Sequence, residues 1–347
     1  MVSLAPLLGL ALRGFVALPD SLLARLVGPL PRNDRGVELD LRAALLVESI
    51  ERAGLNRPER AGPERARAHM DRNSPLVDVA PLPCEVEERQ LPGPAGSLRA
   101  LVFRPRDEAN ELPVLVYFHG GGFVLGSAGS HANVCRLLAV RARCVVVSVE
   151  YRLAPEHPFP AAVDDVLAAY RHVREHARSF GGRSDRVAVG GDSAGGNLAA
   201  VTCLGLRDAG EAPPHLQALV YPCTDCRRGH PSHQRFAEGF FLDRLKLDWF
   251  MTNYLEHASA IVDPRASPLL ATRLDDLPPA LVLTAGFDPL RDEALEYVDR
   301  LREAKVAVDH RCAERLIHGF FSMGGAIPAA RETVIDYADL LRVHLHR

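Results

Sequence analysis

The sequence has no excess of charge of one sign and no long apolar run. Its 347 residues include 41 basic and 44 acidic side chains, for a net charge of −3. This balance argues against a basic nucleic-acid-binding surface. The leucine-rich segment 1–30 is interrupted by Arg13, Pro19, Asp20 and Arg25, so it lacks the roughly 18–20 apolar residues of a membrane span. We expect no nucleic-acid partner and no integral membrane span.

We also expect no secretory signal, because the first basic residue, Arg13, follows the apolar stretch, whereas a signal normally has Lys or Arg before it. Within residues 1–30 we expect two short amphipathic helices, one of which carries leucines at helical spacing. These helices dock on the rest of the chain; peripheral contact with a membrane surface is the alternative. The leucine-spaced residues are Leu22, Leu23, Leu26 and Val27.

Cysteine is neither abundant nor even in number. Seven cysteines at irregular spacing do not form the framework of a secreted disulfide-rich domain. Cys223 and Cys226 form a C-x-x-C, but no second pair accompanies it, so a metal or redox role is the weaker interpretation. We expect reduced cysteines in a cytoplasmic protein, with no metal and no organic cofactor.

The order of patterns along the chain predicts an α/β fold. Residues 1–70 are helical in pattern and form an N-terminal cap segment, and residues 71–83 form a linker that opens the catalytic domain, 71–347. Short apolar strands then alternate with helices, which predicts a mostly parallel sheet with helices on both faces. A helical insertion at about 223–270 adds to the cap. The expected strands are 98–103, 114–118, 144–149, 186–189, 216–221, 280–284 and 306–311, and the helices 132–141, 161–177, 195–208, 290–304 and 328–345.

The strongest local motif is Gly-Asp-Ser-Ala-Gly at residues 191–195. It follows an apolar strand and precedes a helical pattern, as a nucleophile elbow requires. A serine on so sharp a turn adopts strained backbone angles, and the flanking glycines avoid collisions with neighbouring backbone. The N-terminus of the following helix presents unpaired N–H groups where negative charge develops. Ser193 is therefore the expected nucleophile; a glycine-rich turn without function is the alternative.

A second motif, His-Gly-Gly-Gly at residues 119–122, directly follows the strand 114–118. Glycines allow backbone N–H groups to face a ligand, as in the oxyanion holes of lipases and esterases. The alternative is a flexible loop, but the carboxyl end of a sheet strand is where ligands bind. We expect the His119 side chain to brace this loop and not to act as the base.

An acid and a histidine follow Ser193 in the order that such hydrolases require. Asp288 lies just after the expected strand 280–284, within the sequence Gly-Phe-Asp-Pro-Leu. His318 lies after the last expected strand, within the sequence Ile-His-Gly-Phe. His318 would take the proton of Ser193 and Asp288 would orient the imidazole. Asp292 and Glu293 remain alternative acids, and Asp288 with Pro289 could instead begin a helix.

These motifs resemble the hormone-sensitive-lipase-like group of α/β-hydrolase esterases. A further segment of that resemblance is Tyr-Arg-Leu-Ala-Pro-Glu-His-Pro-Phe-Pro-Ala-Ala at residues 151–162, and the likeness covers roughly residues 80–345. It implies the α/β-hydrolase fold, with an eight-stranded, mostly parallel sheet and a helical cap. It also implies an oxyanion hole made by the N–H groups of Gly121, Gly122 and Ala194. The loop 126–131 lacks an acidic residue that many members carry, and His172 stands where many have Trp, so substrate preference is not inherited.

The function predicted from these residues is a serine carboxylesterase for short- to medium-chain esters. Phe123, Asp192, Phe240 and Phe241 are the candidate substrate-pocket residues. An amidase or thioesterase would use the same machinery, and a homodimer is one alternative for the assembly. A binding protein that lost catalysis would lack a working histidine, which His318 argues against. A Rossmann dehydrogenase would need G-x-G-x-x-G after its first strand, which is absent.

Overall fold

The computed structural model describes residues 18–54, 57–106 and 111–347. Eight strands form one sheet in the order β1-β2-β4-β3-β5-β6-β7-β8. β2 pairs antiparallel with β1 and β4, whereas β4-β3-β5-β6-β7-β8 pair in parallel. The strands are β1 Cys84–Gly93, β2 Gly96–Pro105, β3 Leu112–Phe118, β4 Val145–Val149, β5 Gly182–Asp192, β6 Gln217–Val220, β7 Ala280–Phe287 and β8 Val308–Ile317.

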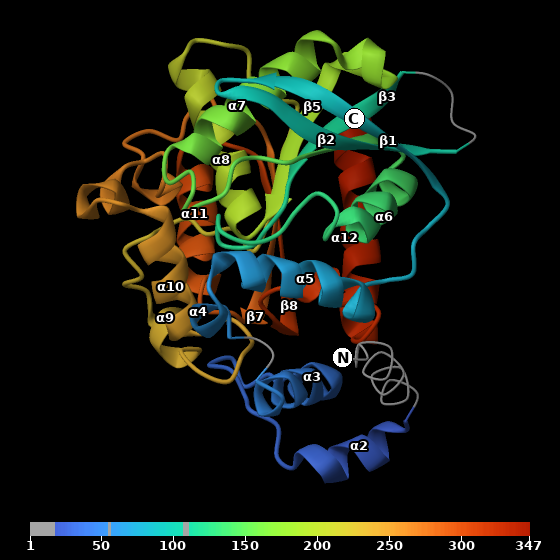
Figure 1. Cartoon of the computed structure of the whole chain (residues 1–347), viewed down its shortest axis with the longest axis vertical. Coiled ribbons are helices and arrows are strands. Elements are labelled where there is room, and N and C mark those ends of the chain that lie inside the picture. The colour runs from blue at the N-terminus through green and yellow to red at the C-terminus, as the bar shows by residue number, and fades with distance from the viewer. Residues whose placement is uncertain (1–17, 55–56, 107–110) are drawn as a thin grey trace.

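Helices cover both faces of this sheet (Figure 1). The α-helices are α2 Asp20–Val27, α3 Leu41–Arg52, α4 Pro58–Ala61, α5 Pro63–Val77, α6 Ala132–Ala142, α7 Ala161–Glu175, α8 Ala194–Asp208, α9 Pro231–Arg235, α10 Arg244–Tyr254, α11 Arg291–Glu303 and α12 Pro328–His346. Short 3₁₀ turns are η1 Ala177–Phe180, η2 Ala258–Val262, η3 Pro268–Leu270 and η4 Phe320–Ser322. The predicted α/β-hydrolase fold is confirmed.

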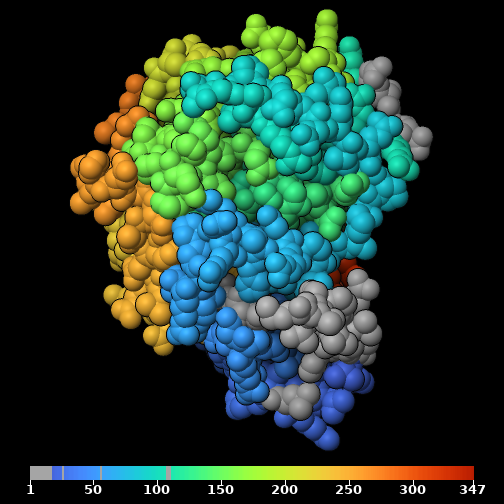
Figure 2. Space-filling view, viewed as in Figure 1, coloured from blue at the N-terminus to red at the C-terminus, as the bar shows by residue number. Residues whose placement is uncertain are grey.

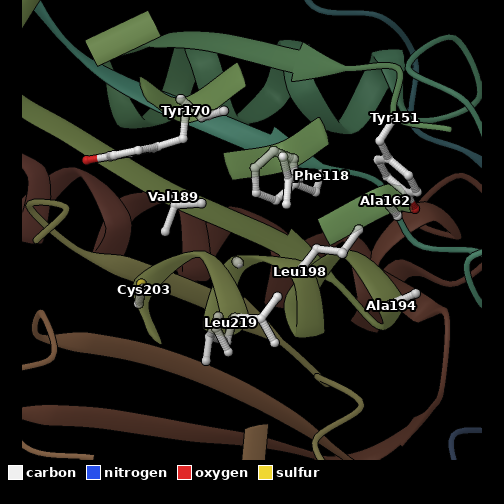
Figure 3. Packing of buried hydrophobic residues seen from close by; sticks show 14 of the residues in the cluster. Phe118, Tyr151, Ala162, Tyr170, Val189, Ala194, Leu198, Cys203 and Leu219 are labelled. Atoms are coloured by element: carbon white, nitrogen blue, oxygen red, sulfur yellow. The ribbon is translucent and has the colours of Figure 1, made fainter. Parts of the chain in front are cut away.

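The two faces of the sheet are buried in two separate apolar clusters. Alternate residues of β3 point to opposite sides: Val114 and Val116 join the cluster with α7 and α8, whereas Leu115 and Tyr117 join the cluster with α6 and α12. Figure 3 shows the first cluster, in which Leu198 of α8 packs beside Phe118. Because both faces are covered, the central strands are continuous apolar runs.

One edge of the sheet was not located from the sequence. β1, Cys84–Gly93, is mostly exposed and carries three Glu and one Arg. It pairs with β2 along its whole length. Charged side chains are common on edge strands because they discourage pairing with other chains. The same charges remove the apolar signal by which the other strands were recognised.

The linker expected at 71–83 begins later than predicted, because residues 71–77 belong to α5. Pro63 begins this helix, where its missing N–H would be unpaired in any case. Pro75 lies in the last turn, so it does not prevent the helix from reaching Val77. Tertiary contacts support the part of the helix that was expected to be linker: the Ser127 hydroxyl donates to the Asp71 Oδ1 at 3.0 Å, and the Gly325 N–H donates to the Val77 carbonyl at 2.9 Å.

The N-terminal and inserted helices lie on the same side of the molecule. α4 contacts α10, and Figure 2 shows the blue helices α4 and α5 beside the orange insertion that contains α9 and α10. Of the two helices expected in residues 1–30, α2 is one. The other falls on residues 1–17 and lies outside the described residues, as does the Leu26 side chain. Between β6 and β7 the described chain contains helices and turns but no strand.

Candidate active site

Ser193 lies on the turn between β5 and α8, with φ 55° and ψ −117°. A positive φ is unusual for a residue with a side chain and is maintained only where the surroundings enforce it. The Ser193 N–H donates to the Val220 carbonyl at 2.9 Å. A Cβ on Gly191 or Gly195 would collide with the Phe118 carbonyl oxygen. Close packing of the turn against the end of β3 therefore explains both glycines.

Two residues from neighbouring strand ends meet Ser193 in a hydrogen-bonded series. The His318 Nε2 lies 2.9 Å from the Ser193 Oγ, and the His318 Nδ1 lies 2.8 Å from the Asp288 Oδ2. Asp288 is fully buried, and its second oxygen accepts from the Leu290 N–H at 2.8 Å. A carboxylate only accepts hydrogen bonds, so the proton belongs on Nδ1 and Nε2 is left to accept from the serine.

The other two candidate acids have different partners. Asp292 accepts from the Arg291 Nε–H and the Ser232 N–H, both at 2.9 Å. Glu293 is fully buried and accepts from the Thr224 N–H at 2.6 Å. Of the three acids, Asp288 is the one that the fold brings to His318.

The residues Gly121 and Gly122 follow β3 and face the start of α8. Among the described residues, neither glycine's N–H donates a hydrogen bond within the protein. Ala194 is the first residue of α8, where the N–H groups have no partner inside the helix. Three backbone donors thus remain available beside Ser193.

Asp192 holds the glycine loop 119–122 in place through a hydrogen bond to Gly120. Its Oδ1 accepts from the Tyr117 hydroxyl at 2.6 Å and from the Gly120 N–H at 3.0 Å, and the His131 Nε2 lies 3.5 Å away. Burial raises the pKa of Asp192, but the charge of His131 together with the hydrogen bonds from His131 and Tyr117 outweighs burial, so the pKa is lowered. Burial lowers the pKa of His131, but Asp192 more than offsets this, so the pKa is raised. These shifts describe a buried ion pair.

Sequence reasoning did not find His131 or Tyr117. Both act through Asp192, which is 61 and 75 residues away along the chain. His119, in contrast, is packed inside the loop: its Nδ1 lies 2.8 Å from the Gly120 carbonyl oxygen and its ring stacks on Tyr151. Burial, with a smaller contribution from His131, lowers the pKa of His119 to about 3, so its ring is neutral.

A mostly apolar cavity of about 300 Å³ opens above Ser193 and His318. Phe123, Asp192 and Phe241 line it, as do residues of α3, α4, α5 and α10. Phe240 does not line it and instead packs with Phe236 and Phe287, at ring-centroid distances of 5.2 and 5.6 Å. The N-terminal and inserted helices thus form the wall opposite the serine.

The described residues contain no group of three or more His, Cys, Asp and Glu side chains arranged to hold a metal ion. Cys223 and Cys226 are free and buried. Hydrogen bonding between them and burial raise the pKa of Cys223 well above its ordinary value. Where the chain is described, every helix is too short or too polar to cross a membrane.

The parallel sheet, the serine on its strand-to-helix turn and the histidine and acid from later strand ends define the α/β-hydrolase class. A family model described as alpha/beta hydrolase fold matches residues 115–322. The chain belongs to the hormone-sensitive-lipase-like family of this fold. The expected resemblance is confirmed.

Relatives and solved structures agree with this assignment. The chain is 45% identical to the carboxylic ester hydrolase LipN of Mycobacterium tuberculosis, over 81% of this chain and 76% of that protein. It is 38% identical to an ethyl acetate hydrolase of Pseudomonas putida, over 88% and 98%. The structure of an ester hydrolase from the Lake Arreo metagenome superposes with a TM-score of 0.85 at 42% identity, over 89% of this chain and all of that one.

Proposed function

We propose that this protein is a serine carboxylesterase that hydrolyses short- to medium-chain carboxylic esters through an acyl-enzyme. The observation that carries the proposal is the hydrogen-bonded series Asp288–His318–Ser193 at the floor of an apolar cavity. Relatives named carboxylic ester hydrolase, ethyl acetate hydrolase and carboxylesterase support ester bonds over amides or thioesters. The cavity volume is at the lower end of the ~300–1,000 Å³ range of ligand sites, which favours small and medium substrates.

In the first half-reaction the Ser193 Oγ attacks the ester carbonyl carbon while His318 Nε2 accepts the hydroxyl proton. The bond to the alcohol oxygen then breaks, and His318 returns the proton to that oxygen. Asp288 holds the ring in the required tautomer and stabilises its charged form. Water, activated by the same histidine, then hydrolyses the acyl-serine.

Negative charge develops on the carbonyl oxygen in both half-reactions. The N–H groups of Gly121, Gly122 and Ala194 form the proposed oxyanion hole, supported by their lack of internal partners at the strand and helix ends. Each such donor is typically worth about 2.7–4 kcal/mol in the transition state. Asp192 contributes by holding Gly120, the residue that leads into this loop.

Three further features are part of the proposal. The N-terminal helices form a cap segment together with the insertion at 223–270, over a catalytic domain that makes up the rest of the chain; because the boundary expected at 70/71 falls inside α5, we place the end of the cap segment at Val77. Free cysteines support a reducing, cytoplasmic location, with peripheral membrane contact of the N-terminal helices as the alternative. A homodimer is the assembly to be tested by size-exclusion chromatography with light scattering.

The direct test is hydrolysis of p-nitrophenyl butyrate by the wild type and Ser193→Ala. We expect kcat/KM to fall at least about a thousandfold. Ser179→Ala, the same change at an exposed serine, is the matched control and should retain wild-type activity. Wild-type activity in Ser193→Ala would contradict the mechanism.

A further inference from the structure

The cavity above Ser193 is bounded by parts of two different apolar clusters. We call the lining residues that belong to the cluster around α7 and α8 the oxyanion-side wall. We call those that belong to the cluster around α6 and α12 the histidine-side wall. The oxyanion-side wall consists of Met70, Phe123, Leu125, Leu247, Phe250 and Met251. The histidine-side wall consists of Leu46, Ile50, Val77, Phe241 and Met323.

Helix α5 spans the distance between these walls. Near its first turn, the Arg67 Nε–H donates to the Val124 carbonyl beside the glycine loop, at 2.7 Å. At its last turn, the Val77 carbonyl accepts from the Gly325 N–H at 2.9 Å, beyond His318 along the chain. Figure 1 shows α5 lying across the end of the sheet. One helix therefore covers two ends of a single cavity.

Each wall contains one phenylalanine of the insertion that packs against a glycine next to the reacting groups, either Gly122 or Gly319. The Phe250 ring lies directly on Gly122, where an added Cβ would collide with it. The Phe241 ring lies against Gly319, the residue after His318, at 3.0 Å from the position of a Cβ there. Phe250 is nearly buried on α10. The Phe241 carbonyl accepts from the buried Lys246 Nζ at 2.7 Å, which holds this residue in place.

The positions of the reacting atoms during ester cleavage indicate which wall contacts the alcohol group and which contacts the acyl chain. The alcohol oxygen must lie within hydrogen-bonding distance of the His318 Nε2, because that atom returns the proton to it. The alcohol group therefore extends over His318 and Gly319 toward Phe241. The carbonyl oxygen occupies the oxyanion hole and the alcohol oxygen faces His318, so the acyl chain leaves the carbonyl carbon in the third direction, away from His318. The apolar lining that remains for it there is the oxyanion-side wall, which contains Phe250.

We propose that Phe241 limits the alcohol group and Phe250 limits the acyl group of the ester, so that two residues of one insertion set two independent specificities. This inference rests on the proposed esterase function. It assigns the histidine-side wall to the alcohol and the oxyanion-side wall to the acid.

Two substrate series separate the two roles. In the acyl series, p-nitrophenyl esters from acetate to decanoate keep the alcohol constant. In the alcohol series, butyrate esters from methyl to hexyl keep the acid constant and are followed by pH-stat titration. The enzymes are the wild type, Phe250→Ala, Phe241→Ala and the milder Phe250→Leu and Phe241→Leu. Leu245→Ala, an exposed residue on α10 that does not line the cavity, is the matched control.

Phe250→Ala should raise the decanoate-to-acetate ratio of kcat/KM about tenfold or more and leave the hexyl-to-methyl ratio within about twofold of wild type. Phe241→Ala should do the reverse, the two Leu variants should shift the same ratios less, and Leu245→Ala should change neither. Ratios within one variant do not depend on the fraction of enzyme that is folded.

Changes in the same series for both variants, or in neither series, would overturn the assignment of the walls while leaving the esterase function intact. Failure of the wild type to hydrolyse any ester, or full activity in Ser193→Ala, would instead overturn the proposed function.

Discussion

Replacing Asp192 with Asn tests whether a buried charge supports the glycine loop. The side chain keeps its size but loses its negative charge. In the wild type it accepts from the Tyr117 hydroxyl at 2.6 Å and the Gly120 N–H at 3.0 Å, and it faces His131 at 3.5 Å. Asp192 is only 5% exposed, so water does not screen these interactions appreciably.

The size of the effect follows from these contacts. A hydrogen bond to a charged acceptor contributes about 1.5–3 kcal/mol and one to a neutral acceptor about 0.5–1.5, so each of the two bonds loses about 1 kcal/mol. His131 loses its partner and becomes neutral instead of remaining a buried charge, which limits the further loss. We expect Asp192→Asn to lower the free energy of unfolding by about 2–3 kcal/mol. A looser Gly120 should also lower kcat about tenfold.

The loss should depend on pH in a defined direction. The pKa of His131 is raised in the folded state, so its contribution is complete below the ordinary value of about 6.5 and is lost as pH rises through the raised value. The pKa of Asp192 is lowered, so its contribution is present above about pH 4 and is lost in acid. The stability of the wild type should therefore exceed that of Asp192→Asn most between about pH 4 and 6.5, and by less once pH has risen through the raised pKa of His131.

Urea unfolding of both proteins across this pH range measures the difference. Asp185→Asn, an exposed carboxylate on the same strand β5, is the control and should leave the urea midpoint essentially unchanged. A difference for Asp192→Asn below about 0.5 kcal/mol at pH 6 would refute the contribution worked out for the charged carboxylate. A difference that does not fall as pH rises through the raised pKa of His131 would refute an ion pair between Asp192 and His131.

Two other substitutions test the site and its support. Asp288→Asn should lower kcat for p-nitrophenyl butyrate by about 10³–10⁴, because the histidine loses its orienting carboxylate; a loss below about tenfold would reassign the acid. Asn197→Ala removes two buried hydrogen bonds of 2.8 Å, to the Cys223 and Ala266 carbonyls. It should cost about 2–4 kcal/mol in urea unfolding, and an unchanged midpoint would show that α8 does not hold these loops.

Local patterns were sufficient for most of the fold. The alternation of strands and helices predicted the mostly parallel sheet because each strand and helix carries its own period in the sequence. The edge strand β1 escaped since its charged, exposed residues show no apolar period. Pro75 suggested a linker, although the contacts of Asp71 with Ser127 and of Val77 with Gly325 support a longer helix. Both differences come from contacts outside the segment itself.

The sequence by itself determined that Ser193 lies on a glycine-flanked turn and that an acid and a histidine follow it, because turn chemistry and order along the chain are local properties. The tertiary structure alone decided which side chains meet. It brought Asp288, rather than Asp292 or Glu293, to His318. It also turned Phe241 toward the cavity and its neighbour Phe240 away from it. Such choices depend on how distant segments pack, which no local pattern encodes.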